Sequence, residues 1–252
     1  MELGSKVIVS CKDRHGAGLR LAHALRQSPS TSWKRTELPL DLPLDSYGLV
    51  DVALSGQIVN FVDSEGSPQV SLILLQNYKA PTSACVAYEV LKFIKTKAST
   101  QSLSFTVIFP SFTVIPKSLQ NLRCLQLEDM EQSLYAAEIN EGSDFSKAIT
   151  RGLKRLPPTT HISDDLLASF LHFVHVLKVP AVLLLAPITQ NSRLDSKGTK
   201  MQQVEDSQML CKLGDLLASH MELIFSKELL ENQNTPIEIE KNVEDDWRRL
   251  YG

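Results

Sequence analysis

The sequence predicts an α/β protein: a three-layer sandwich around a central mixed, mostly parallel sheet. Segments with strand-like and helix-like patterns interleave along the chain, which is typical of this fold class. Residues 181–186, AVLLLA, are apolar at every position, as in a strand whose two faces are both covered by helices. Two β-rich runs, residues 57–63 and 69–75, flank a short segment that contains Gly66. They predict a hairpin, so we expect some antiparallel pairing in the sheet.

The first elements follow from apolar runs and turn signals. Residues 6–11, KVIVSC, predict a buried strand. Residues 16–26 predict a helix, because Leu19, Ala22 and Leu25 fall on one side of it. Residues 27–48 contain three prolines, which predicts a loop between this helix and the hairpin.

The middle of the chain predicts alternating helices and strands. Ser83 is a suitable N-cap for a helix that runs to about Lys97. Three further strands are expected, at residues 102–110, 123–128 and 133–139. The first of them should end at Pro110, because proline has no N–H to donate to a sheet. A short helix is expected from Asp144 to about Leu153.

The clearest unit is the helix and strand over residues 162–188. Ser163 is a capping residue, and Asp164 and Asp165 complement the positive end of the helix dipole. Pro180 prevents the helix from continuing into the apolar strand that follows. Apolar side chains recur at helical spacing at Leu166, Phe170, Phe173, Val174 and Leu177.

The last part of the chain changes in composition. A loop that contains Gly198 and a helix from about Val204 to His220 complete the predicted fold. Residues 226–246 hold seven acids and two lysines and few side chains that could pack. We therefore expect an α/β domain over residues 1–225 and a flexible acidic C-terminal tail over residues 226–252.

The overall composition is that of an ordinary globular protein, with 43% hydrophobic and 22% charged residues. At 252 residues the chain can bury a core without disulfides or metals. Its 26 basic and 29 acidic residues give a formal net charge of −3, which is too balanced to indicate a nucleic-acid or membrane surface. We therefore expect neither nucleic acid nor a membrane as a partner.

Cysteine spacing and apolar runs indicate the compartment. Cys11, Cys85, Cys124 and Cys211 form no C-x-x-C, so neither a disulfide framework nor a zinc site is predicted. The N-terminus lacks the pattern of a signal peptide. The longest apolar stretch, residues 179–188, is far shorter than the roughly 20 residues that a membrane span needs. We expect the cytosol as the compartment, with the nucleus as a second one.

Residues 7–18, VIVSCKDRHGAG, share only an outline with a dinucleotide-binding loop. In that fingerprint the first glycine follows the strand almost at once, whereas here residues 12–15 intervene and Leu21 stands at the third glycine position. We interpret the segment as a strand-to-helix loop. The sequence also lacks the G-x-x-x-x-G-K-[ST] of a P-loop ATPase and the G-x-S-x-G of a nucleophile elbow.

Two histidines and two aspartates are candidates for a chemical site. His172 and His175 could share a ligand face on the predicted helix, but they fall at the polar margin of its apolar stripe and no H-E-x-x-H occurs. We interpret them as surface histidines, and Asp164 and Asp165 as helix-start acids rather than a general acid and base. We predict no metal, no cofactor and no catalytic residue.

The last three residues combine a hydrophobe, a tyrosine and a terminal carboxylate: Leu250, Tyr251 and Gly252. This ending resembles the hydrophobic–tyrosine–any motif of proteins that dock between α subunits of the 20S proteasome. Residues 166–188 resemble a segment of the proteasome assembly chaperone 1 family, in which a helix ends at a Lys-(Ile/Val)-Pro-Ala turn and enters a hydrophobic strand. The corresponding turn is formed here by Lys178, Val179, Pro180 and Ala181.

The resemblance implies a non-enzymatic chaperone of 20S proteasome assembly with a phosphorylase-like α/β fold. Members of the family form a heterodimer with a second assembly chaperone, and the heterodimer sits on the α ring. Carried onto this sequence, the motif makes Leu250 a pocket filler and Tyr251 the residue that orders the groove. The carboxylate of Gly252 would pair with a lysine of an α subunit.

Two alternatives stay open at this point. A phosphorylase-like small-molecule enzyme or a nucleotide-binding protein would need polar groups that converge at strand ends. Ser10, Asp13 and Arg14, which follow the first strand, are the best candidates for that role. The second alternative is a scaffold that uses its Leu-Tyr-Gly ending for a different partner.

Overall fold

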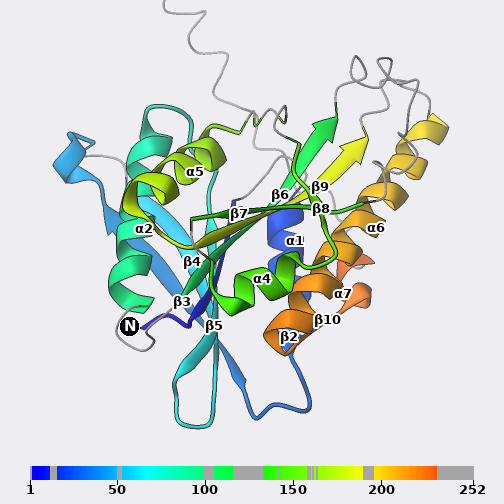
Figure 1. Cartoon of the computed structure of the whole chain (residues 1–252), viewed down its shortest axis with the longest axis horizontal. Helices are drawn as coiled ribbons and strands as arrows, with labels where there is room; N and C mark the ends of the chain where they lie inside the picture. Colours follow the sequence, from blue (N-terminus) through cyan, green and yellow to red (C-terminus); the bar gives the residue numbers. More distant parts are fainter. Residues whose placement is uncertain are drawn as a thin grey trace, which may run out of the picture.

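Within the described residues, eight strands form one mixed sheet, which is the middle layer of the protein (Figure 1). The computed structural model describes residues 2–11, 16–49, 53–98, 105–115, 133–140, 142–157, 160, 162, 164–189 and 196–231. The strands are β1 (Lys6–Cys11), β3 (Lys34–Pro43), β4 (Ala53–Val62), β5 (Pro68–Leu75), β6 (Thr106–Ile115), β7 (Tyr135–Ile139), β8 (Lys154–Arg155) and β9 (Ala181–Thr189). They lie in the order β3-β4-β5-β1-β6-β9-β7-β8.

The centre of the sheet is parallel and its margins contain antiparallel pairs. β5, β1, β6 and β9 run parallel to one another. β4 is antiparallel to both β5 and β3, whereas β7 is antiparallel to β9 and parallel to β8. The mixed, mostly parallel sheet is therefore confirmed. The predicted hairpin is also confirmed as β4 and β5, with Gly66 in the turn at a φ of 84°.

Helices cover both faces of the sheet (Figure 1). On one face lie α1 (Ala17–Ala24), α4 (Asp144–Thr150), α6 (Ser196–Met221) and α7 (Lys227–Glu231); on the other lie α2 (Thr82–Ala98) and α5 (Asp165–Leu177). Each face has its own apolar core. β1 contributes Ile8 to the first core and Val7 and Val9 to the second, as the period of two in a strand requires. The predicted three-layer α/β architecture is confirmed.

β9 shows why its sequence does not alternate. Residues 181–186 are all buried. Val182 and Leu184 lie in the core beneath α1 and α6, while Leu183 lies in the core beneath α2 and α5. A strand that loses water on both faces needs an apolar side chain at every position.

Two helices begin at residues other than those predicted. The carboxylate of Asp164 accepts a hydrogen bond from the Leu167 N–H at 2.7 Å, so Asp164 is the N-cap of α5 and the prediction of Ser163 is wrong. Asp and Ser cap a helix equally well, so residue type alone did not separate the two. α2 begins at Thr82, and the N–H of Ser83 already donates to a backbone carbonyl of the preceding turn. The prediction of Ser83 as an N-cap is therefore also wrong.

The predicted loop over residues 27–48 is wrong for its second half, which forms β3. Among the described strands it lies at the edge of the sheet and pairs with β4 alone, from Lys34 opposite Val62 to Pro43 opposite Ala53. Proline is tolerated in an edge strand because its missing N–H can face away from the neighbouring strand.

The prediction that the strand before Pro110 ends there is wrong as well, because β6 continues to Ile115. In β6 the Thr106 N–H donates toward β1 and the Val107 N–H donates toward β9. Pro110 therefore lacks an N–H on the β1 side. The pairing of β1 with β6 stops at Ile8 and Ile108, so this missing donor breaks no ladder.

The structure also differs from the prediction in two short strands and in the start of α6. β2 (Leu25–Gln27) and β10 (Leu223–Phe225) form a two-stranded antiparallel sheet that the sequence did not predict. α6 begins at Ser196, ahead of the predicted start near Val204. The predicted strand over residues 123–128 lies outside the described residues. None of the described helices is both long and apolar enough to cross a membrane.

We expect Gly18→Ala to destabilise the protein, although alanine normally favours a helix over glycine by roughly 1 kcal/mol. A Cβ at this position would lie 2.2 Å from the Ser10 hydroxyl and 2.6 Å from the Cys11 carbonyl. Relieving this clash should lower the free energy of unfolding by about 1–3 kcal/mol, measured by urea denaturation. Thr96→Ala, at an exposed position of α2, is the control and should be neutral. A more stable Gly18→Ala variant would contradict the close packing of α1 on β1.

Candidate functional site

The residues predicted to bind a partner, Leu250, Tyr251 and Gly252, lie outside the residues that the structure describes. The structure does describe the place from which the chain continues toward them. β10 pairs with β2, and the Ser226 N–H donates to the Ala24 carbonyl at 2.9 Å. α7 follows at once and packs against α1 (Figure 1).

Apolar packing holds α7 on the body. Leu230 is only 5% exposed and belongs to the core shared by α1 and α6. Just before α7, the Phe225 ring lies on Gly214, where a Cβ atom would come within 2.2 Å of the ring. The ion pair between Lys227 and Asp215, at 3.0 Å, is exposed and contributes little. The segment predicted as a tail from residue 226 onward therefore begins with a short helix that Leu230 anchors on the body.

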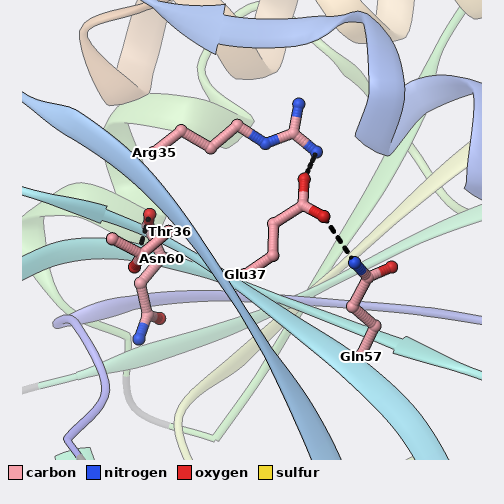
Figure 2. A network of polar contacts seen from close by, with 5 residues as sticks. All are labelled: Arg35, Thr36, Glu37, Gln57 and Asn60. Carbon is pink, nitrogen blue, oxygen red and sulfur yellow. Dashed lines mark hydrogen bonds and ion pairs between the residues drawn. The ribbon is translucent and has the colours of Figure 1, made fainter.

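A polar network lies on β3 and β4 at the edge of the sheet (Figure 2). Arg35 Nη2 pairs with Glu37 Oε1 at 2.8 Å, and Gln57 Nε2 donates to Glu37 Oε2 at 2.7 Å. In the ladder Arg35 is opposite Phe61 and Glu37 is opposite Val59, and both of these apolar residues belong to the core beneath α1. Paired residues share a face, so the two charged side chains lie on the α1 side of the sheet.

More basic side chains converge on this network from α1 and β2. Burial lowers the pKa of Arg35, and nearby Arg26 lowers it further, while Glu37 opposes the shift. Burial also lowers the pKa of His23, with Arg35 and Arg26 adding to the effect and Glu37 opposing it. The imidazole is therefore neutral at pH 7. We refer to His23, Arg26, Arg35 and Glu37 as the edge cluster.

The sequence did not predict the edge cluster. Its members are drawn from a helix, a three-residue strand and a segment that was predicted as a loop. Had β3 been recognised as a strand, the period of two would have placed Arg35 and Glu37 on one face.

The carboxyl end of β1 was the best candidate for a small-molecule site. Ser10 is 3% exposed there, and its hydroxyl lies against α1 at Gly18. Gly16 precedes the helix with a φ of 63°, which is a conformation that suits glycine. Asp13 and Arg14 lie outside the described residues. In the described part of this region, Ser10 and both glycines thus serve the packing of α1 on β1.

The histidines of α5 lie on the surface and its two aspartates lie at the start of the helix, as predicted. His172 and His175 are exposed, and the His172 ring makes an edge contact with the ring of Phe173, with the centroids 5.2 Å apart. Asp164 caps the helix and Asp165 lies in its first turn. Among the described residues, no group of three His, Cys, Asp or Glu side chains could hold a metal ion.

The outer surface of α2 and α5 carries aromatic and apolar side chains. The rings of Tyr88 and Phe173 meet edge to face with centroids 5.5 Å apart. Tyr47 donates to Glu89 Oε1 at 2.7 Å, and burial together with this bond raises the pKa of Tyr47. Val176 is 55% exposed beside them. Exposed groups of this mixed aromatic and aliphatic kind are suited to contact with protein.

Fold and surfaces together define a three-layer α/β protein with a mixed eight-stranded sheet. The whole chain, residues 1–252, belongs to the family described as Domain of unknown function (DUF7894). A comparison with curated proteins gives no match.

Several solved structures share the fold. A protein with unknown function from Thermoplasma acidophilum is 10% identical, with 99% of this chain and 89% of that chain covered and a TM-score of 0.57. PbaB of Pyrococcus furiosus, an archaeal proteasome activator, is 12% identical, with 100% and 96% covered and a TM-score of 0.51. A protein of unknown function from Corynebacterium glutamicum is 10% identical, with 99% and 83% covered and a TM-score of 0.53. At these identities the likeness shows the fold alone.

We expect Leu230→Ala to lower the free energy of unfolding by about 2–3 kcal/mol, because it removes a buried side chain and leaves a cavity under α7. Leu229→Ala is the matched control, since Leu229 is the adjacent residue of the same helix and is only partly buried. It should cost less than about 1 kcal/mol. Urea denaturation followed by circular dichroism measures both values. Equal losses in the two variants would contradict Leu230 as the anchor of α7.

Proposed function

We propose that this chain is a non-enzymatic chaperone of 20S proteasome assembly in the cytosol and nucleus. It forms a heterodimer with a second assembly chaperone, and the heterodimer acts on the α ring. Its residues Leu250, Tyr251 and Gly252 dock into a pocket between α subunits. The observation that carries the proposal is this ending on a chain whose fold is similar to that of an archaeal proteasome activator.

Two findings support the proposal. The likeness to PbaB covers 100% of this chain, so it includes the whole α/β body rather than one motif. The turn that resembles the proteasome assembly chaperone 1 family is also well formed. Lys178 ends α5 in the left-handed conformation with a φ of 53°, and Pro180 immediately precedes β9.

The chemistry of the ending is suited to a preformed pocket. A leucine and a phenol can fill an apolar groove, while the α-carboxylate pairs with a lysine at its base. A short tail alone binds weakly because it loses conformational entropy. When it is joined to a body that touches the same ring, the effective concentration can raise affinity by about 10²–10⁴-fold. The 15 residues between Glu231 and Trp247 span roughly 20 Å on average as a flexible chain.

Adding one alanine after Gly252 should weaken binding to proteasome α rings. The addition moves the carboxylate by about 3.5 Å, beyond the reach of a lysine placed for the native end. We expect Kd to rise roughly tenfold or more, because a charge-assisted hydrogen bond is lost. Binding of the purified heterodimer to α rings can be measured by biolayer interferometry.

In the control variant the extra alanine is inserted between Asn234 and Thr235, so the terminal carboxylate stays on Gly252. It should bind like the wild type. Undiminished binding of the extended variant would contradict the pocket, and equal weakening of both variants would point to linker length instead. If the tagged chain purified from its own cells brings no α subunits with it, the proposed function is lost.

A further inference from the structure

The region around the edge cluster contains buried cationic groups that are not fully satisfied. Within the described part of the chain, the Nε atoms of Arg20 and Arg35 are buried and have no hydrogen-bond partner. The Arg35 side chain is 10% exposed, so the missing bond is not simply replaced by bulk water. A buried donor without a partner costs free energy of about 1–3 kcal/mol. An acceptor brought to either arginine would remove this cost.

The two arginines lie on the same side of the sheet. Arg35 is on the α1 side of β3, as its pairing with Phe61 shows. Arg20 precedes His23 by three residues on α1, and residues three apart lie on one helix face. His23 in turn lies close enough to Arg35 to feel its charge. We define the basic face as the edge cluster together with Arg20, which lies one turn before His23 on the same side of α1.

The charge of the basic face is unbalanced. Arg20, Arg26 and Arg35 carry three positive charges, and the one carboxylate found in the edge cluster is that of Glu37. Glu37 already binds Arg35 and Gln57. Arg26 forms no ion pair with any described residue. Acidic groups are the natural partners for this surface, since charge-assisted hydrogen bonds are about twice as strong as neutral ones.

An acidic segment of the same chain begins beside this face. The Ser226 N–H is bonded to Ala24, one residue from His23 and two from Arg26. α7 adds five residues on α1, about 7.5 Å of helix, before the chain continues. Residues 236–246, PIEIEKNVEDD, then carry five acids and one lysine, a net charge of −4. α7 itself packs on α1, which carries His23, and the four residues 232–235 reach about 13 Å further when extended at about 3.3 Å each.

We propose that residues 236–246 dock on the basic face of their own protein. The carboxylates of Glu238 and Glu240 alternate with Ile237 and Ile239, so in an extended segment both acids can face the arginines while the isoleucines turn the other way. The docked segment supplies acceptors for the Nε atoms of Arg20 and Arg35. The docking does not depend on the proposed function. It adds to that function a way of holding residues 250–252 near the body until a partner competes for them.

Hydrogen–deuterium exchange of the full-length wild-type chain tests the proposal. At low salt, about 50 mM, we expect amides of residues 236–246 to exchange at least about fivefold slower than an unstructured chain. At about 0.5 M salt the protection should be lost, because the Debye length falls to a few ångströms. The wild-type chain is measured alone, so the result is separate from any binding to proteasome subunits.

Variants of Arg26 identify the docking surface. Arg26 has no ion pair to break in the described structure, so Arg26→Gln should fold normally and lose the protection of residues 236–246. Arg26→Lys should keep it, and so should Lys95→Gln, which removes a positive charge from α2 on the opposite face of the sheet.

Three results would overturn the proposal. The first is exchange of residues 236–246 at the unstructured rate in low salt. The second is protection that survives Arg26→Gln, which would place the segment elsewhere. The third is protection that fades on dilution, since it would show that a second copy supplies the segment.

Discussion

Burial of the central strands on both of their faces is the constraint on which the rest of the structure depends. Residues 181–186 of β9 are all buried, and five of these six side chains fill two separate cores. Each buried aliphatic side chain is worth about 1.5–3 kcal/mol, so neither helical layer can be dispensed with. α5 and α2 cover one face and α1, α6 and α7 cover the other. Among the described strands, the sheet ends at β3 on one side and at the two-residue strand β8 on the other.

This constraint also decides where function can reside. A polar group placed along the middle of the sheet would be buried between helices and would need its own partners. Ser10 illustrates this, since α1 covers its hydroxyl at the end of β1. The outer face of α2 and α5 and the edge at β3 lie outside the middle of the sheet, and side chains such as Val176 and Glu37 reach solvent there.

The sequence predicted the elements whose pattern is local. The unbroken apolar run of β9 and the helical stripe of α5 needed no knowledge of the rest of the chain. β3 was missed because prolines normally break strands, and only its place at the sheet edge makes them harmless. Pro110 misled for a similar reason, since the ladder it could break ends before it. The edge cluster could not be predicted because β2, β3 and α1 are brought together by non-local pairing. The terminal motif is the opposite case: it is readable in the sequence alone, and the partner proposed for it is another molecule.

The two roles assigned to the C-terminal segment set limits on each other. In the first role residues 236–246 dock on the basic face. In the second role residues 250–252, which follow closely in the chain, insert into a ring. If the internal docking were worth about 2 kcal/mol, the segment would be released about 3% of the time, and a partner that needs it free would bind about 30-fold more weakly. Tethered insertion offers about 3–5 kcal/mol, which exceeds that cost. The internal contact can therefore restrain the tail without preventing insertion, and only a partner that also engages the body supplies the difference. Under the proposed function, such an arrangement would favour proteasome precursors over an isolated pocket that accepts a leucine and a tyrosine.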